Sequence, residues 1–116
     1  MDPSGFLPLT PHQFHILLAL VDRNRHGYGV IQDVDRRTAG ELRLGTGTLY
    51  TAIARLVELG LIAEADRTDE RRRYYQLTTL GRAVLRAETA RLEALVRHAR
   101  ERGVRPASLP ALPRRP

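Results

Sequence analysis

The chain has 116 residues, of which 42% are hydrophobic and 28% are charged, and it contains no cysteine. This length suits one compact domain, and the missing cysteines exclude disulfides and thiolate metal sites. No stretch approaches the roughly 18 apolar residues of a membrane span, and residues 1–9 lack the features of a secretory signal. We therefore expect a cytoplasmic protein that does not contact a membrane.

The net charge of +6 is unevenly distributed along the chain. Residues 79–116 carry nine arginines against three acidic residues, whereas residues 1–78 carry ten of each. Because the excess of arginine over acidic residues lies in the last third of the chain, basic composition alone is weak evidence for nucleic-acid binding. Local clusters of arginine are the better indicator.

A first helix is predicted from Pro11 to about residue 22. Thr10 and Gln13 have the spacing of a capping box, and proline is favoured at the first helical position. Apolar residues then recur at helical spacing on the face that we expect to be buried, namely Phe14, Leu17, Leu18 and Val21. Residues 1–9, which are rich in proline and glycine, are expected to form a flexible leader.

A polar turn over residues 23–26 leads to a second predicted helix, which begins at residue 27 or 28 and ends near residue 38. Ile31 and Val34 are its expected inward-facing residues. Residues 41–44 alternate between polar and apolar side chains, which indicates a very short strand.

The run Gly-Thr-Gly-Thr over residues 45–48 opens a third predicted helix. Gly60 suits the left-handed position that ends such a helix. The expected buried stripe of this helix consists of Leu49, Ile53, Leu56 and Val57.

Two short strands over residues 61–66 and 71–77 are predicted to form a β-hairpin around a charged turn at residues 67–70. Side chains alternate between the two faces of a strand, so one of Tyr74 and Tyr75 points inward and the other outward. The sequence does not decide which of the two is buried.

Thr78 caps a long final helix that is predicted to reach about residue 102. Apolar positions in this helix recur every seven residues and form a seam that is too long for so small a domain to cover alone. Part of the seam is expected to pack on the first helix. We favour dimerisation through its remaining surface, and the candidate residues are Leu85, Leu92, Leu95, Val96 and Ala99.

This order of elements predicts a mainly α fold of the α+β class, a winged helix-turn-helix with a C-terminal dimerisation helix. The winged helix-turn-helix is assigned to residues 10–78 and the dimerisation helix to residues 79–102. The tail over residues 103–116, rich in proline and arginine, is expected to be disordered.

Four stretches together resemble one protein family. They are residues 9–20 (LTPHQFHILLAL), 26–31 (HGYGVI), 44–50 (LGTGTLY) and 71–78 (RRRYYQLT). In this order and spacing they closely resemble the PadR family of bacterial transcriptional regulators, over about residues 9–102. The resemblance implies a winged-helix dimer, usually a repressor, that binds an inverted-repeat operator as double-stranded DNA. Where members commonly have proline in the third stretch, this chain has Thr46.

In a helix-turn-helix, the second helix of the pair lies in the major groove with its first residues facing the bases. The corresponding candidates for DNA contact here are Thr46, Thr48, Tyr50, Thr51 and Arg55. The backbone N–H groups at the glycine-rich start of this helix suit a phosphate. The alternative interpretation is that Thr48 only caps the helix and Tyr50 packs against the first helix.

The hairpin has the densest positive charge of the chain. Its candidates for contact with backbone phosphates are Arg67, Arg71, Arg72 and Arg73. Alternatively, the adjacent Asp69 and Glu70 pair with these arginines in a solvated turn. Tyr28, at the start of the second helix, is either a further phosphate contact or a core residue.

The sequence does not predict an enzyme, a bound cofactor or a metal site. It has no nucleophile elbow, phosphate-binding loop or paired-carboxylate motif. His12 and His15 share a helix face, but no third ligand completes a metal site.

Two further questions stay open at this stage. The family resemblance implies that a small hydrophobic or phenolic effector can bind. Three alternatives remain for this effector. It binds in an aliphatic pocket around Leu92, Leu95 and Val96, it binds elsewhere, or the protein has no effector. The alternative function is a winged-helix adaptor that binds proteins and not DNA, which the balanced charge of residues 1–78 favours.

Overall fold

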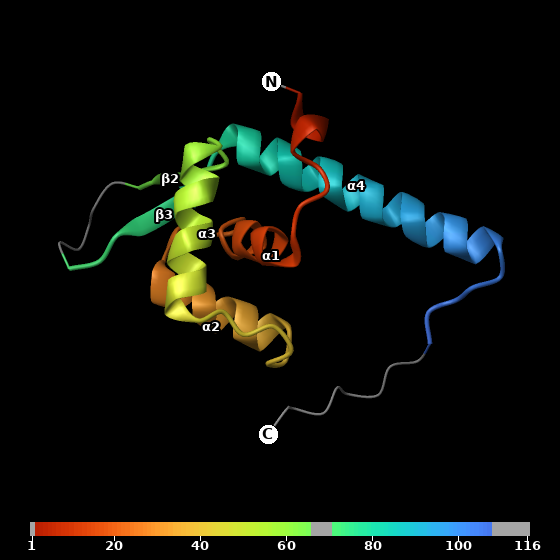
Figure 1. Cartoon of the computed structure of the whole chain (residues 1–116), viewed down its shortest axis with the longest axis horizontal. Helices are drawn as coiled ribbons and strands as arrows, with labels where there is room; N and C mark the ends of the chain where they lie inside the picture. Colours follow the sequence, from red (N-terminus) through yellow and green to blue (C-terminus); the bar gives the residue numbers. More distant parts are fainter. Residues whose placement is uncertain (1, 66–70, 108–116) are drawn as a thin grey trace.

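The computed structural model describes residues 2–65 and 71–107, in which helices pack around a small sheet (Figure 1). The elements follow in the order η1 (Pro3–Phe6), α1 (Pro11–Ala19), β1 (Arg25–His26), α2 (Gly27–Arg37), α3 (Thr46–Glu58), β2 (Ile62–Glu64), β3 (Tyr74–Leu77) and α4 (Thr79–Glu101). The α2–α3 pair, the β2–β3 wing and the long last helix confirm the predicted α+β winged helix-turn-helix.

Helix α1 begins where the capping box predicts. The N–H of Gln13 donates to Thr10 Oγ1 at 3.1 Å, and the N–H of Thr10 donates to Gln13 Oε1 at 3.0 Å. The helix ends earlier than predicted, at Ala19, whose carbonyl accepts a hydrogen bond from Arg25 Nε at 2.7 Å. The buried residues of this segment are Ile16, Leu17, Ala19 and Leu20, whereas the predicted Phe14, Leu18 and Val21 are only half-buried.

The first residues do not form the flexible leader that the sequence predicted. Residues 3–6 form η1, which packs against α4, and Phe6 and Leu7 lie against the core. Leu9 is buried, and its N–H donates to a carboxylate oxygen of Glu88 at 2.7 Å. The apolar side chains of residues 6–9 therefore fix this segment to α4. The proline and glycine content, on which the prediction of a flexible leader rested, does not reveal this packing.

Helices α2 and α3 each turn one apolar stripe toward the core. The buried stripes consist of Val30 and Val34 on α2 and of Leu49, Ile53 and Leu56 on α3. Two predicted members differ, because Ile31 is half-buried and Val57 is exposed. Each follows a buried residue directly, so the helical rotation turns it toward the edge of the stripe.

The connection between α2 and α3 is not the strand predicted over residues 41–44. Ala39 and Gly40 turn the chain with left-handed backbone angles, φ of 50° and 78°. Leu44 is then buried, and residues 41–44 belong to neither of the two strand pairs among the described residues. The third strand of the sheet is instead β1, which comes from residues predicted to be a polar turn.

The described sheet has the strand order β1-β3-β2, and both pairs are antiparallel. Arg25 pairs with Tyr75 across β1 and β3, and Glu64 pairs with the same tyrosine across β2 and β3. Of the two tyrosines, Tyr75 is buried and Tyr74 is half-buried. The rings of Tyr74 and His26 form an edge-to-face contact, with their centroids 5.2 Å apart. The predicted turn at residues 67–70 lies outside the described residues.

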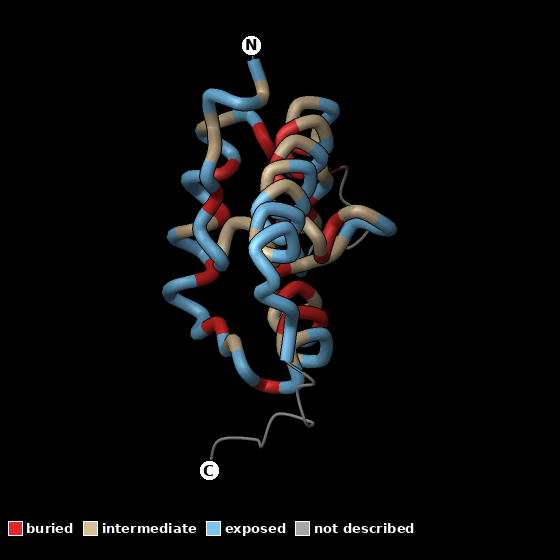
Figure 2. Tube along the Cα trace, turned by 90° about the vertical axis from the view of Figure 1, so that its right-hand side faces the viewer, coloured by how far each residue is buried: buried red, intermediate tan, exposed pale blue. Residues whose placement is uncertain are grey.

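Helix α4 begins at its predicted cap, because Thr78 Oγ1 accepts from the N–H of Gly81 at 2.9 Å. Its first half packs on the core through Val84 and Leu85, and its second half projects beyond the domain and is exposed (Figure 2). Within the ranges that the structure describes, no helix combines the length and apolar character needed to cross a bilayer.

Gly81 brings α4 unusually close to the backbone of Leu61, the residue before β2. A Cβ atom at this position would lie 2.0 Å from the carbonyl oxygen of Leu61 and 2.8 Å from Leu77 Cδ1. Backbone cannot move aside as a side-chain end can, so the close packing of α4 on the residue before β2 requires glycine here.

We predict that Gly81→Ala lowers the free energy of unfolding by about 3 kcal/mol, because overpacking forces α4 away from Leu61. Gly47→Ala is the matched control, since a Cβ there meets nothing within 4 Å and helix propensity favours alanine over glycine. Urea denaturation of both variants checks this. Equal stability of the two variants would contradict the close approach.

Candidate nucleic-acid interface

The first turns of α3 present an exposed polar surface. Thr46, Thr48, Tyr50, Thr51 and Arg55 are all exposed, as the sequence analysis expects of residues that contact DNA. Gly45 is the N-cap residue, and no side chain caps this helix. Thr48 therefore does not act as the cap, and the backbone N–H groups of the first turn are available for an anion.

Tyr50, which the alternative interpretation placed against α1, packs on the start of α2. A Cβ on Gly27 would lie 2.4 Å from the Tyr50 hydroxyl oxygen, so the tyrosine ring lies directly over the glycine backbone. Tyr28 is not a core residue, because 61% of its surface is exposed. Tyr28 of α2 and Tyr50 of α3 thus lie together where these two helices begin.

The end of the wing next to β3 brings arginines to the same place. Arg71, Arg72 and Arg73 are exposed, and Arg72 Nη1 lies 2.7 Å from His26 Nε2. Arg73 is paired with Glu64 across the hairpin at 3.8 Å. The predicted contact Arg67 lies outside the described residues.

These elements enclose a cavity of about 350 Å³, which we call the wing hollow. It is lined by His26, Gly27, Tyr28, Tyr50, Arg71, Arg72, Arg73 and Tyr75. The wing and the starts of α2 and α3 lie at one end of the molecule, opposite the free end of α4 (Figure 1). The structure therefore brings five of the ten predicted DNA-contact residues together around this hollow, namely Tyr28, Tyr50, Arg71, Arg72 and Arg73.

Arg55 extends this surface along α3. Its guanidinium pairs with Glu58 at 2.6 Å, and both side chains are exposed. A groove of about 470 Å³ lies between this part of α3 and the start of α1. Its lining residues are Thr10, His12, Gln13, Gly47, Thr48, Thr51, Ala52 and Arg55.

Sequence reasoning missed two polar residues on the other side of Tyr28. Gln32 and Arg43 are exposed and line a cavity of about 360 Å³ together with Tyr28. Gln32 follows Tyr28 by four residues, which places both on one helix face, and Arg43 comes shortly before the N-cap of α3. Those two spacings are the signals that would have found them.

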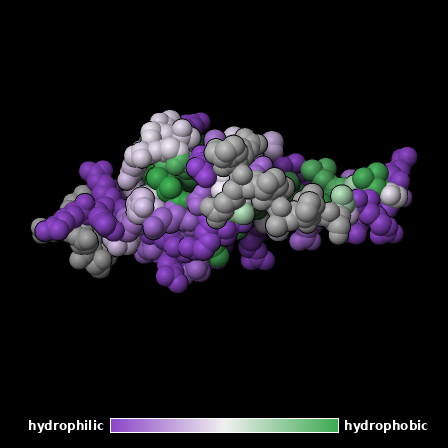
Figure 3. Space-filling view, turned by 90° about the horizontal axis from the view of Figure 1, so that it is seen from below, coloured by the Kyte–Doolittle hydropathy of each residue, from purple (hydrophilic) through white to green (hydrophobic). Residues whose placement is uncertain are grey.

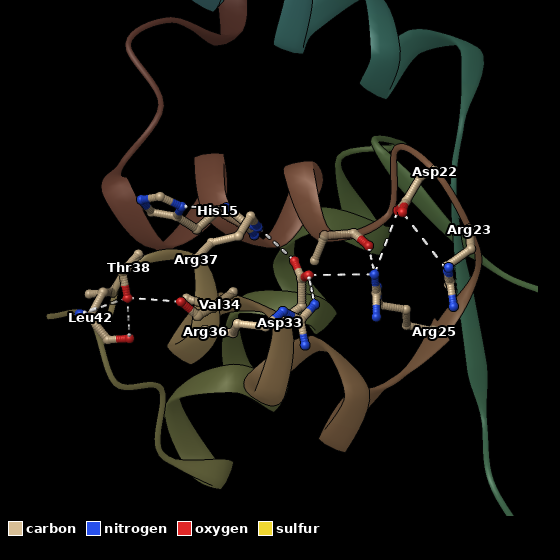
Figure 4. Close-up of polar contacts among 11 residues, drawn as sticks. His15, Asp22, Arg23, Arg25, Asp33, Val34, Arg36, Arg37, Thr38 and Leu42 are labelled. Carbon is tan, nitrogen blue, oxygen red and sulfur yellow. Dashed lines mark hydrogen bonds and ion pairs between the residues drawn. The ribbon is translucent and has the colours of Figure 1, made fainter. Parts of the chain in front are cut away.

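A buried aspartate holds α2 in place beneath this surface (Figure 4). Asp33 forms ion pairs with Arg36 and Arg37 at 2.7 Å each and with Arg25 at 3.4 Å, and we call these four residues the Asp33 network. Arg25 also donates to the carbonyl of Ala19, at the end of α1. Because Arg25 belongs to β1, the network connects α1, α2 and the sheet.

Arg37 extends the Asp33 network to the middle of α1 (Figure 4). Its Nη2 donates to the carbonyl of His15 at 2.9 Å, and its Nη1 lies 3.0 Å from His15 Nδ1. Since guanidinium only donates, His15 Nδ1 accepts and the imidazole is neutral. Burial lowers the pKa of His15 below its ordinary value of 6.5, and the charges of Arg37 and His12 lower it further. In the described ranges, neither histidine belongs to a group that can hold a metal ion.

The far half of α4 carries apolar side chains on the surface, which Figure 3 shows as hydrophobic patches at the α4 end of the molecule. Leu92, Leu95 and Val96 are 37%, 51% and 46% exposed. Leu85, which was predicted to dimerise, is buried in the domain's own core instead, and Ala99 is half-buried. A groove of about 500 Å³ beside this surface is lined by Phe14, Thr89, Leu92, Glu93, Val96, Arg97 and Arg100.

The fold and the exposed α2–α3 surface define a winged helix-turn-helix protein. The chain belongs to the transcriptional regulator PadR-like family, whose model matches residues 16–87. This confirms the resemblance found from the sequence motifs. A protein of Lysinibacillus sphaericus described as uncharacterized is 33% identical over 73 residues, which cover 60% of this chain and 67% of that protein.

Solved structures with the same fold include regulators from several organisms. A transcriptional regulator from Clostridium thermocellum is 23% identical with a TM-score of 0.66, covering 84% of this chain and 93% of its own. A PadR family transcription regulator from Clostridium difficile R20291 is 22% identical with a TM-score of 0.66, covering 79% and 97%. RosR of H. salinarum is 28% identical with a TM-score of 0.65, covering 84% and 89%.

We predict that Asp33→Asn lowers the free energy of unfolding by about 3 kcal/mol, because it removes the charge of the buried carboxylate that three arginines share. Asp35→Asn, two residues along the same helix, is the control and should change stability by less than about 0.5 kcal/mol. Chemical denaturation measures both. A similar loss in the two variants would show that the network does not hold α2.

The lowered pKa of His15 predicts a dependence of stability on pH. Below about pH 6.5 the unfolded chain takes up a proton at this histidine before the folded chain does, so the free energy of unfolding falls as the pH falls. The loss ends once the pH is below the folded pKa. His15→Gln should reduce this part of the pH dependence in denaturation curves recorded between about pH 7.5 and pH 5. An unchanged profile would contradict a neutral, Arg37-bound imidazole.

Proposed function

We propose that this PadR-like regulator binds double-stranded DNA through α3, the start of α2 and the wing. The observation that supports this most directly is the exposure of two tyrosines and three consecutive arginines around one hollow, together with the uncapped start of α3, the helix that carries Tyr50. An uncapped helix start and arginine side chains both favour phosphate oxygens. The threonine hydroxyls at the start of α3 suit contacts with base edges in the major groove.

The proposed division of roles follows the chemistry of each side chain. Arg71, Arg72 and Arg73 contact the phosphodiester backbone and give affinity that does not depend on sequence. Thr48 and Thr51 face the bases and give selectivity. Arg55 reaches DNA only after its exposed ion pair with Glu58 opens, which costs little because surface pairs of this kind contribute at most about 1 kcal/mol.

We further propose that the active form is a homodimer built through the far half of α4. Leu92, Leu95 and Val96 form an apolar strip there that a second copy would bury. Two α3 helices related by such a dimer would meet an inverted-repeat operator about one DNA turn apart, ~34 Å. A dimer seated on an operator that overlaps a promoter represses transcription by blocking access.

The place we propose for a small hydrophobic or phenolic effector is the groove between α1 and α4. Phe14 adds an aromatic ring to the aliphatic Leu92 and Val96, which the sequence analysis did not expect, and Arg97 and Arg100 add positive charge at its edge. A ligand bound there lies next to the proposed dimer surface, so its binding would change the separation of the two α3 helices.

The experiment is selection of bound sequences from a pool of genomic DNA fragments, followed by affinity measurements on the selected duplex at increasing salt. We expect an inverted repeat and an affinity that falls steeply with salt, because each phosphate contact releases counterions. Thr48→Ala should relax sequence preference, with a loss of about tenfold on the selected duplex and little loss on a random one.

Arg86→Ala is the control for this experiment, since it removes one exposed charge from α4 and leaves the α2–α3 surface intact. Its affinity should match that of the unaltered chain within about twofold. If no fragment is retained while a protein partner is bound stably, the chain acts as a protein-interaction adaptor and the DNA-binding proposal is wrong.

A further inference from the structure

Arg43 differs from the other arginines of the described range 2–65 in having no acidic partner. The other arginines of this range each pair with a carboxylate, namely Arg23, Arg25, Arg36, Arg37 and Arg55. Within the described residues, the guanidinium of Arg43 forms neither an ion pair nor a hydrogen bond, and its side chain is exposed. All of its N–H donors are therefore available to an anion from outside the chain.

The turn after α2 determines where this guanidinium lies. Ala39 and Gly40 have left-handed backbone angles, and the chain then runs back along α2 toward α3 (Figure 1). A Cβ atom on Gly40 would lie 3.8 Å from Arg43 Nη2, so the arginine side chain rests against the turn. Arg43 also comes only two residues before Gly45, the N-cap residue of α3. The turn thus holds a positive charge beside the start of α3.

Arg43 lines the cavity of about 360 Å³ on the outer face of α2, which we call the Arg43 cavity. Tyr28 and Gln32 line it as well, and both are exposed. Neither side chain forms a hydrogen bond within the part of the chain that the structure describes, so a hydroxyl and an amide are further available donors. Tyr28 also lines the wing hollow, so the two cavities adjoin at this tyrosine.

Asp35 is the acidic residue that lines the Arg43 cavity. Its Oδ1 would lie 3.7 Å from a Cβ atom on Gly40, so the carboxylate and the Arg43 guanidinium flank the same glycine. No ion pair joins the two groups in the described structure. An anion in this cavity is attracted by Arg43 and repelled by Asp35, so removing either charge has an effect of opposite sign on its binding.

We propose that Arg43 and the Tyr28 hydroxyl bind one phosphate of the DNA backbone in the Arg43 cavity, with the Gln32 amide as an additional donor. This rests on the proposed DNA-binding function and adds a backbone contact on the side of Tyr28 away from the wing. A guanidinium binds two phosphate oxygens through parallel hydrogen bonds, which fixes direction as well as distance. Phosphates held on both sides of Tyr28 set the orientation of α3 in the major groove.

The test measures binding of the unaltered chain and of Arg43→Ala to the selected duplex over a series of salt concentrations. We expect Arg43→Ala to weaken binding by about tenfold, the lower end for hydrogen bonds to a charged group, and to reduce the salt slope by about one. Its melting temperature should be unchanged, because Arg43 is exposed and without a partner among the described residues. Arg86→Ala, which removes an equally exposed arginine from α4, is the control and should leave the salt slope as it is.

Asp35→Asn tests the same cavity with the opposite sign. It should strengthen binding by about threefold at low salt and by less at high salt, because it removes the carboxylate that repels the phosphate. A merely structural aspartate would not raise the affinity of the folded protein. An affinity equal to or below that of the unaltered chain would contradict a phosphate in the Arg43 cavity.

Interference by ethylated phosphates, which carry no charge, locates the contact on the duplex. Binding of Arg43→Ala should become insensitive to ethylation at one phosphate of each half-site, and binding of Arg72→Ala at a different one. If Arg43→Ala keeps the interference pattern and the affinity of the unaltered chain, the site is wrong and DNA binding stands. If the unaltered chain binds no duplex, the proposed function fails and the site fails with it.

Discussion

Asp33 occupies the position on which the candidate DNA-binding surface depends, because its carboxylate joins parts of the chain that are distant in sequence. Arg25 and Arg37 both form ion pairs with Asp33 and donate hydrogen bonds to backbone carbonyls of α1. Arg25 also lies in β1, where it pairs with Tyr75 of the wing. A buried carboxylate is costly unless its charge is balanced, so all of these contacts must form together. The orientation of α2 toward the wing is therefore set by one anion and its arginines.

The wing hollow is the consequence of that arrangement at the surface. The start of α2 is glycine because the ring of Tyr50 lies against it, and the wing reaches the same place through β3. The whole net positive charge of the chain lies in residues 79–116, yet the arginines that face the hollow belong to residues 1–78, which carry no net charge. The local arrangement of the wing, and not the overall composition, places these arginines where they can bind an anion.

Local rules account for the parts of the structure that could be predicted. The capping pair Thr10 and Gln13, the cap Thr78 and the left-handed Gly60 depend on a few neighbouring residues, and the structure contains them all. Strand β1 could not be predicted in this way, because its two residues become a strand only by pairing with Tyr74 and Tyr75. The ordered leader likewise depends on a carboxylate 79 residues away.

The same distinction applies to the candidate site. The exposed face of α3 follows from its apolar stripe, but the contact between His26 and Arg72 joins residues 46 positions apart and has no periodic signal. The most direct test of the central claim is to follow backbone amide resonances while a DNA duplex is added. Shifts confined to the starts of α2 and α3 and to β3 are predicted. Shifts confined to α4, or none at all, would contradict a DNA-binding surface at this end of the molecule.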